Sequence, residues 1–166
     1  MRKIAKLILL GSMAWLLCVP ASLVAGNPSP MPDFQLTSLD GQTIKSADLP
    51  SSGSWLLIYI QPTSHYSDQL VKSLTKERFP NLPSRAVFVV AGSVDDAKAV
   101  KARYEALSSA AWYADPSKAA FTQLKLHGVP VVLGVLGKTI QWNLNGLLSD
   151  DKTFQSILNS WITSKS

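Results

Sequence analysis

An unbroken apolar run that leads directly into a polar corner is the feature that most constrains this chain. Residues 55–60, Trp-Leu-Leu-Ile-Tyr-Ile, are typical of a strand buried on both faces of a sheet. From residue 67 onward, apolar side chains recur at helical spacing, and Asp68 lies early enough to favour the positive end of a helix. The polar residues 61–67 are therefore predicted to form a strand-to-helix corner.

The same order of elements is repeated further along the chain. Residues 86–91 form a second apolar run, and Ser93 is placed to cap a helix that we expect to extend through Val100, Tyr104 and Leu107. Strand, helix, strand and helix in this order predict a parallel unit with a right-handed crossover.

Shorter elements are predicted around this unit. An Asp-Gly turn between residues 34–37 and 43–45 indicates a hairpin. Residues 111–114 predict a short edge strand, and a further helix is expected to start at Asp115, with Pro116 at its first helical position.

The carboxyl-terminal part has the pattern of a hairpin followed by a helix. Residues 129–136 and 139–144 are separated by a Gly-Lys turn, and residues 151–163 carry one apolar stripe at helical spacing. Parallel strands followed by an antiparallel hairpin and a helix predict an α/β sandwich with a mixed sheet.

The amino-terminal segment resembles a secretory signal. A short basic head precedes an almost wholly apolar stretch from Leu7 to Val24, and Ala21 and Ala25 are two possible cleavage points. We predict a signal peptide over residues 1–25, an extended tether over 26–32 and one domain over 33–164. An uncleaved membrane anchor is the alternative, since the apolar run is barely long enough to cross a bilayer.

Removal of this segment changes the chemistry of the chain. The single cysteine, Cys18, lies inside it, so the mature chain has no thiol for a disulfide, a nucleophile or a metal ligand. Of the 16 basic residues, Arg2, Lys3 and Lys6 also lie there, which leaves 13 against 11 acidic residues. So small and scattered an excess does not predict binding to nucleic acid or to an anionic membrane surface, and membrane contact is expected only through a retained amino-terminal segment.

The motifs of the remaining chain resemble a known superfamily when taken in order. They are Pro32-Asp33-Phe34-Gln35-Leu36, Asp40-Gly41, Val94-Asp95-Asp96, Asp115-Pro116, Gly128-Val129-Pro130 and Leu136-Gly137-Lys138. From Met31 to Trp161 the chain is similar to the thioredoxin-like proteins, in particular the exported thiol-disulfide oxidoreductases of cytochrome maturation and the related peroxiredoxins. The resemblance implies a three-layer sandwich whose central mixed sheet is flanked by helices.

The resemblance also implies where reactive cysteines would lie, and this chain lacks them. When the strand of such proteins is aligned with this chain from Leu56, their Cys-x-x-Cys motif falls on Ser64 and Ser67. When the peroxiredoxin pattern is aligned instead, Gln69 occupies the position of the reactive cysteine. Disulfide exchange requires a thiolate, and a serine hydroxyl is far too weak an acid to replace it. A serine at a helix start can instead cap the helix, which contributes about 1 kcal/mol.

Other chemistries at the corner have weaker support. Ser64 and His65 are sequence neighbours without the glycines of a nucleophile elbow, so a hydrolase pair is not favoured. With only His127 as a second histidine and no thiolate, no metal site is expected, and no cofactor is predicted.

The resemblance also implies a peptide-binding groove, which does not require thiols. The resemblance implies a cis peptide bond before Pro130 and places Val129-Pro130 beside residues Ser64, His65, Tyr66 and Ser67. An exposed Tyr66 would offer a rigid aromatic contact of the kind enriched in interfaces.

Three hypotheses follow for function. The first is a redox-inactive, non-enzymatic, periplasmic or otherwise extracytoplasmic protein that binds an exported protein or peptide through residues 64–67 and 129–130, as an assembly module of the cell envelope. The second is an enzyme that uses His65 as acid or base beside Ser64, Ser67 or a carboxylate such as Asp68 or Asp115. The third is a structural domain whose useful surface lies elsewhere, such as the outer face of the last helix.

Overall fold

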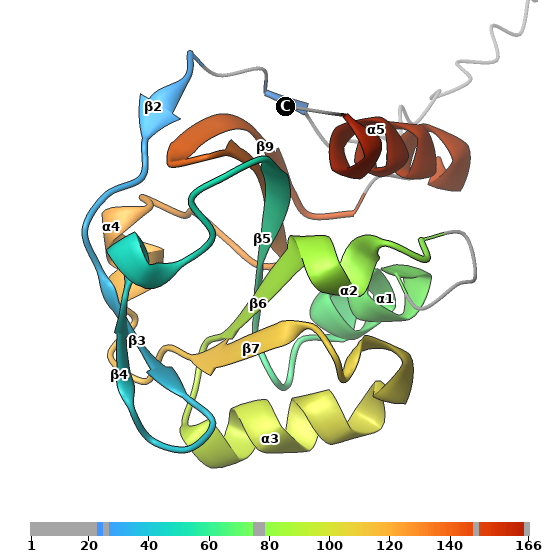
Figure 1. The fold of residues 1–166 in the computed structure, drawn as a ribbon. Helices are drawn as coiled ribbons and strands as arrows, with labels where there is room; N and C mark the ends of the chain where they lie inside the picture. Colours follow the sequence, from blue (N-terminus) through green and yellow to red (C-terminus); the bar gives the residue numbers. More distant parts are fainter. Residues whose placement is uncertain (1–22, 25–26, 75–78, 148–149, 165–166) are drawn as a thin grey trace, which may run out of the picture.

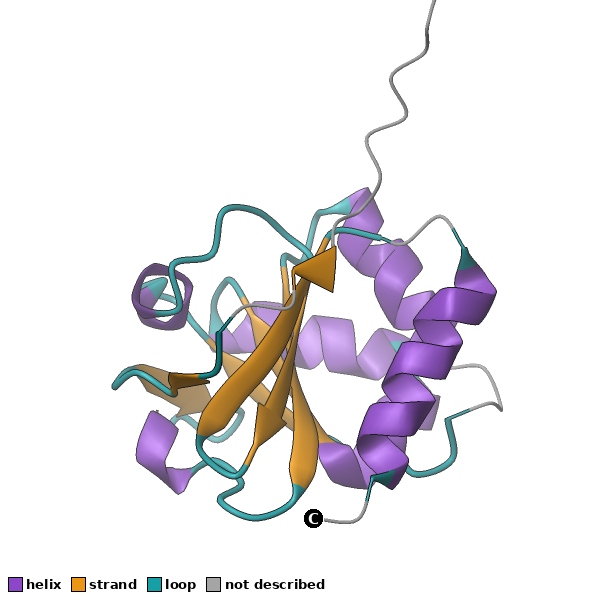
Figure 2. Ribbon diagram, turned by 90° about the horizontal axis from the view of Figure 1, so that it is seen from above, coloured by secondary structure: helices purple, strands orange, loops and turns teal. Residues whose placement is uncertain are grey.

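One mixed sheet forms the centre of the molecule. The structure is a computed structural model that describes residues 23–24, 27–74, 79–147 and 150–164. The strand order is β1-β9-β8-β5-β6-β7-β3-β4, and β2 also pairs with β9. Helices stand on both sides of the strands (Figures 1 and 2), which is the three-layer α/β sandwich that the sequence predicted.

The bounds of the elements are as follows. The strands are β1 (Leu23–Val24), β2 (Ser29–Pro30), β3 (Gln35–Ser38), β4 (Thr43–Lys45), β5 (Ser54–Ile60), β6 (Ala86–Val90), β7 (Ala111–Ala114), β8 (Val131–Leu136) and β9 (Thr139–Asn145). The α-helices are α1 (His65–Leu74), α2 (Leu82–Arg85), α3 (Val94–Arg103), α4 (Ala119–Gln123) and α5 (Asp151–Thr163), and the short 3-10 helices are η1 (Ser46–Asp48) and η2 (Glu105–Leu107).

Strand β5 separates two apolar cores. It pairs in parallel with β6 and antiparallel with β8, and all of its residues are buried. Because side chains alternate along a strand, Leu56 and Ile58 face the helices α1, α3 and α5, while Leu57 and Tyr59 face α4 and the β3–β4 hairpin. The prediction of a strand buried on both faces is confirmed.

Two predicted boundaries of helices are wrong. Helix α1 begins at His65 rather than at Ser67, because Ser64 already accepts the first helical N–H bond through its carbonyl. Helix α3 ends at Arg103, so it stops before Tyr104 and Leu107. The Tyr104 N–H closes the last turn on the Lys101 carbonyl, and the chain continues as the separate turn η2.

Two further predictions fail around β7. This strand is internal rather than at an edge, because the β3–β4 hairpin folds back and pairs Thr37 with Ala114. The next helix, α4, begins at Ala119 and not at Pro116. Residues 115–118 form a turn in which the Asp115 carboxylate accepts the N–H groups of Ala119 and Phe121.

The chain also contains elements that the sequence did not indicate. Helix α2 is too short for a periodic pattern to be recognised. Within the range expected to be a tether, Ser29 and Pro30 pair with Ile140 and Thr139 of β9, and the Met31 N–H donates to the Lys138 carbonyl at 2.8 Å. Most of the predicted signal peptide, including Cys18, lies outside the described residues, although Leu23 and Val24 pair with β9 as β1.

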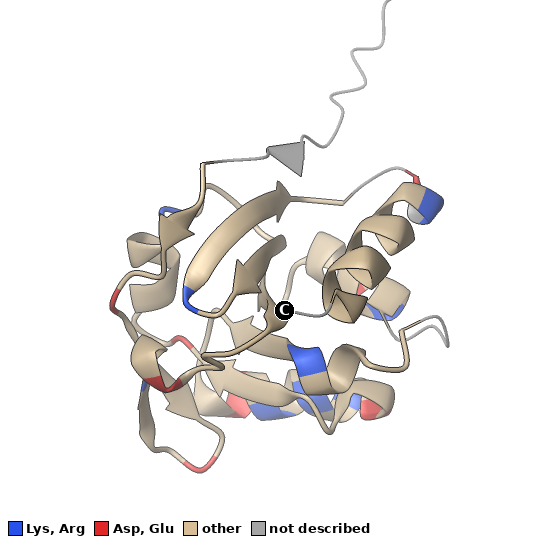
Figure 3. Ribbon diagram, turned by 45° about the horizontal axis from the view of Figure 1, so that its top comes forward, with Lys and Arg blue, Asp and Glu red and all other residues tan. Residues whose placement is uncertain are grey.

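Helix α3 carries Asp95 and Asp96 in its first turn and Lys101 and Arg103 in its last turn, so its charge changes from negative to positive along the helix (Figure 3). None of the helices in the described ranges is both long and apolar enough to cross a membrane.

A close aromatic contact makes Gly134 sensitive to substitution. A Cβ atom added there would lie 2.0 Å from the Trp142 ring, which packs edge-on against Trp161 with 5.5 Å between ring centroids. Trp161 is itself held, because its Nε1–H donates to the Trp55 carbonyl at 3.0 Å. We expect Gly134→Ala to lower the free energy of unfolding by about 1–3 kcal/mol in denaturant titration.

The matched control is Gly128→Ala, where an added Cβ would meet no atom within 4 Å. It should change the free energy of unfolding by less than about 0.5 kcal/mol. Equal stability of the Gly134→Ala variant and the unsubstituted chain would contradict the packing described for Trp142.

Candidate functional site

The two serines at the corner are used to hold its backbone. The Ser64 Oγ accepts the Ser67 N–H at 3.3 Å, and the Ser67 Oγ accepts the Gln61 N–H at 3.1 Å. Ser67 is buried and Ser64 half-buried. Ser64 therefore has the capping role predicted from the sequence, and Ser67 joins the first turn of α1 to the residue that follows β5, without a covalent link.

His65 and Tyr66 point outward from the first turn of α1. Tyr66 is 61% exposed, and its ring centroid lies 6.1 Å from that of His65. In the described part of the chain, His65 makes no hydrogen bond to Ser64, Ser67, Asp68 or Asp115. The arrangement required by the non-thiol enzyme hypothesis is therefore not met, because an acid or base needs an oriented partner and a pocket.

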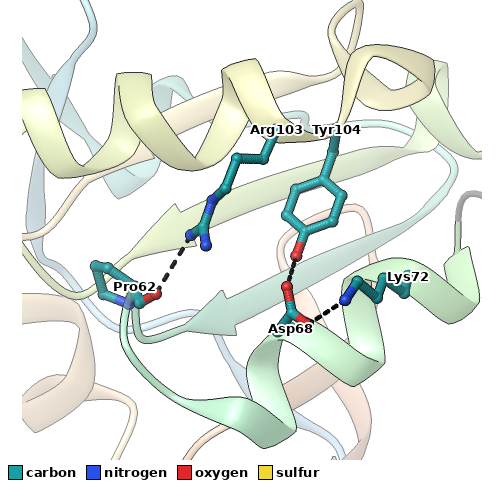
Figure 4. A network of polar contacts seen from close by, with 5 residues as sticks. All are labelled: Pro62, Asp68, Lys72, Arg103 and Tyr104. Atoms are coloured by element: carbon teal, nitrogen blue, oxygen red, sulfur yellow. Dashed lines mark hydrogen bonds and ion pairs between the residues drawn. The ribbon is translucent and has the colours of Figure 1, made fainter.

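A polar network fixes the corner to the end of α3 (Figure 4). The Arg103 guanidinium donates to the Pro62 carbonyl at 3.3 Å, and the Tyr104 hydroxyl donates to the Asp68 carboxylate. Lys72 pairs with the same carboxylate at 2.7 Å. Hydrogen bonds from Lys72 and then from Tyr104 lower the pKa of Asp68, whereas burial and then the bond to Asp68 raise the pKa of Tyr104 to about 12.

The loop before β8 contains the cis peptide bond that the resemblance implied. It joins Val129 to Pro130. Pro130 is buried, and its carbonyl accepts the Gly146 N–H at 2.8 Å. The main-chain N–H and C=O of Val129 have no partner among the residues that the structure describes, so both are available to a bound chain.

A cavity of about 200 Å³ lies between the end of β5, the loop at Val129 and helix α4. Gln61 and Val129 both line it, so the structure brings the corner and the cis-proline loop together there. The other predicted groove residues, which are Ser64, His65, Tyr66, Ser67 and Pro130, do not line this cavity.

The buried carboxylate of Asp115 holds residues that line the cavity. Asp115 is fully buried and accepts three hydrogen bonds, from the Tyr59 hydroxyl at 2.9 Å and from the N–H groups of Ala119 and Phe121. Burial, and next the charge of Asp115, raise the pKa of Tyr59. These contacts fix the two aromatic rings, Tyr59 and Phe121, that line the cavity.

Sequence reasoning missed most of this cavity. Gln61 carried a usable signal, because the carboxyl end of a buried parallel strand is a common ligand-binding position in α/β sheets. Lys118 and Phe121 gave no such signal, since they were expected within a regular helix. No group of three or more His, Cys, Asp or Glu side chains in the described ranges could hold a metal ion.

The fold is similar to that of known thiol-disulfide oxidoreductases. One is a secreted Mycobacterium tuberculosis disulfide oxidoreductase homologous to E. coli DsbE, with a TM-score of 0.59 and 15% identity over 76% of this chain and 95% of that one. Another is the thioredoxin domain of a Bacteroides vulgatus thiol-disulfide oxidoreductase, with a TM-score of 0.58 and 14% identity over 84% and 99%. A Sinorhizobium meliloti protein of undefined function has a TM-score of 0.64 and 13% identity over 87% of each chain.

No protein-family profile and no curated protein sequence matches this chain. At the identities of the solved structures, the similarity shows the fold alone. The chain therefore has the thioredoxin-like fold, as the sequence motifs predicted.

The network at Tyr104 generates a pH-dependent prediction. The phenol has an ordinary pKa of 10.0 and a folded pKa of about 12, so its contribution to stability is present below pH 10 and is lost as pH rises through 12. Tyr104→Phe should cost about 1 kcal/mol at neutral pH and should make the alkaline loss of stability less steep.

The measurement is the free energy of unfolding in urea across this pH range. Tyr66→Phe is the control, since that phenol is exposed and makes no hydrogen bond in the described chain. An alkaline slope that is the same in the Tyr104→Phe variant as in the unsubstituted chain would contradict the predicted linkage.

The geometry at Ser64 predicts how a thiol would behave there. A Ser64→Cys sulfur would lie where the Ser67 N–H and the positive end of α1 stabilise a thiolate. Its pKa should fall below the value of about 8.5 for a free cysteine, as measured by thiolate absorbance against the unsubstituted chain. In contrast, Ser160→Cys, exposed near the negative end of α5, should titrate at or above that value, and equal values for both variants would refute the prediction.

Proposed function

We propose that this chain is an exported, redox-inactive thioredoxin-fold protein that binds a protein or peptide partner in the cell envelope. The proposed groove consists of residues Ser64–Ser67 and Val129–Pro130. The observation that carries the proposal is the N–H and C=O of Val129, which have no partner among the described residues and lie near a corner whose two serine hydroxyls already accept main-chain N–H groups.

The chemistry of the corner supports redox inactivity. Both hydroxyl oxygens accept main-chain N–H groups, and neither can form the covalent sulfur link that disulfide exchange requires. Cys18 is the single cysteine of the sequence and lies within the predicted signal peptide. Purified protein should therefore show no disulfide reductase activity.

The groove has the features of a binding site for an extended peptide. A strand-like peptide gains affinity from main-chain hydrogen bonds, and Val129 offers one donor and one acceptor. Tyr66, which is exposed on the first turn of α1, adds an aromatic surface with a polar tip. Export is supported by the signal-like segment at residues 1–25, and one protein of similar fold is described as secreted.

The proposal is tested by photo-cross-linking in the exported fraction. A photoreactive phenylalanine analogue at position 66 should give a discrete product with one partner, and Tyr66→Ala should weaken recovery of that partner in a pulldown. The same analogue at Leu136, the other large hydrophobic side chain exposed in the described chain, is the control, because it lies at the far end of β8.

Pro130→Ala provides a second test of the groove. Because Pro130 is buried, the variant is first checked for cooperative unfolding and then assayed for partner recovery, which should fall. The proposal fails if positions 66 and 136 give the same products, or if neither Tyr66→Ala nor Pro130→Ala alters recovery of the partner.

A further inference from the structure

The cavity beside Val129 has the size of a small-ligand site. Its volume is about 200 Å³, and the side chains of Tyr59, Phe121, Ala91 and Val129 supply apolar walls. An apolar cavity of about 150 Å³ is large enough to hold benzene. This cavity can therefore accept a phenyl or branched aliphatic group and still leave space for a small polar head.

Two polar side chains at the cavity have unused hydrogen-bonding capacity. Lys118 lines the cavity, is exposed and makes no ion pair within the described ranges. The main chain of Gln61 is already used, since its N–H donates to Ser67 and its C=O accepts from Ser64. The Gln61 side-chain amide has no partner in the described part of the chain and can bind a ligand.

The position of Lys118 is determined by the turn before α4. Its backbone has the left-handed φ of 56°, which is uncommon for a residue with a side chain, and its N–H donates to the Asp115 carbonyl at 3.2 Å. Such conformations persist only where surrounding contacts hold them, and they cluster at ligand sites. Here the Asp115 carboxylate anchors the turn by binding Ala119 and Phe121.

The nearby negative charge does not neutralise Lys118. Both oxygens of Asp115 are bonded to main-chain N–H groups or to the Tyr59 hydroxyl, and none is bonded to the Lys118 ammonium. The cavity therefore presents a cation that has no ion-pair partner in the described ranges, the Gln61 amide and an apolar interior. That combination favours a ligand with an anionic head and a compact apolar body.

We propose that this cavity binds a carboxylate attached to a phenyl-sized or branched aliphatic group. The apolar group packs against Phe121, Ala91 and Val129, and the carboxylate accepts hydrogen bonds from the Lys118 ammonium and the Gln61 amide. The same chemistry is found in a free arylalkanoic acid and in the last residue of a polypeptide that ends in an apolar side chain. This site goes beyond the proposed partner groove and shares only Val129 with it.

The test uses the full chain and two pairs of probes. Hydrocinnamate is compared with hydrocinnamyl alcohol, and the tripeptide Gly-Gly-Phe with its amidated form, by following the amide resonances of Lys118 and Gly128 in NMR titrations. Loss of the ion pair should weaken binding of the alcohol and of the amidated peptide by about tenfold or more. Tighter binding of hydrocinnamate than of Gly-Gly-Phe would indicate that the natural ligand is a small acid. Tighter binding of Gly-Gly-Phe would indicate that it is the carboxyl terminus of a polypeptide.

Matched variants distinguish the contribution of the Lys118 charge to binding from that of the cavity's shape. Lys118→Gln should lose at least about tenfold in affinity for the acid, whereas Lys125→Gln should not. Lys125 is the matched control because it also has a left-handed backbone, with φ of 52°, but does not line the cavity. Ala91→Leu should block binding by filling the cavity, provided that its unfolding remains cooperative.

The outcomes also separate this proposal from the partner groove. Tyr66→Ala should leave binding of hydrocinnamate unchanged even if it abolishes partner recovery. The carboxylate site is overturned if neither acid binds, if the alcohol binds as tightly as the acid, or if Lys118→Gln and Lys125→Gln have equal affinities.

Discussion

Burial of β5 on both faces is the constraint on which the rest of the structure depends. Leu56 and Ile58 belong to the core under the long helices, and Leu57 and Tyr59 belong to the core under α4. A strand in this position cannot shift by one residue without exchanging the two sets of side chains between the two cores. Its carboxyl end is therefore fixed, and the corner at residues 61–67 and one wall of the cavity are fixed with it.

The corner shows how this fold can hold its backbone with serines at the two positions where the resemblance places cysteines. Two serines occupy the positions that the resemblance assigns to cysteines, and each binds a main-chain N–H. The network from Asp68 to Tyr104 and from Arg103 to Pro62 adds contacts between α1, α3 and the turn (Figure 4). These hydrogen bonds hold the backbone of the corner without a covalent link, and the proposed function uses its shape rather than its reactivity.

The sequence predicted those elements whose patterns are local and long. Residues 54–60 and 151–163 form the expected strand and helix, because an unbroken apolar run and a helical stripe are both readable without tertiary information. The internal position of β7 could not be read, since it depends on a hairpin that folds back from a distant part of the chain. The start of α4 was missed for a related reason, because the buried Asp115 carboxylate determines it.

The candidate site was predictable to a smaller extent. The resemblance located the corner and the cis bond before Pro130, and the capping role of Ser64 follows from residue type and position. The cavity was not predictable, because its lining residues come from four separated segments. Lys118 in particular acquires its position from a backbone conformation that no local pattern indicates.

The pairing of Ser29 and Pro30 with β9 limits self-association of the molecule through this strand. An uncovered outer strand presents a row of N–H and C=O groups that can template pairing with another chain. Here the segment leading into the domain covers part of that row, and Pro30 brings no N–H of its own to the outer side. Removal of the residues before Phe34 would therefore expose this edge of β9, which could then pair with a strand of another molecule.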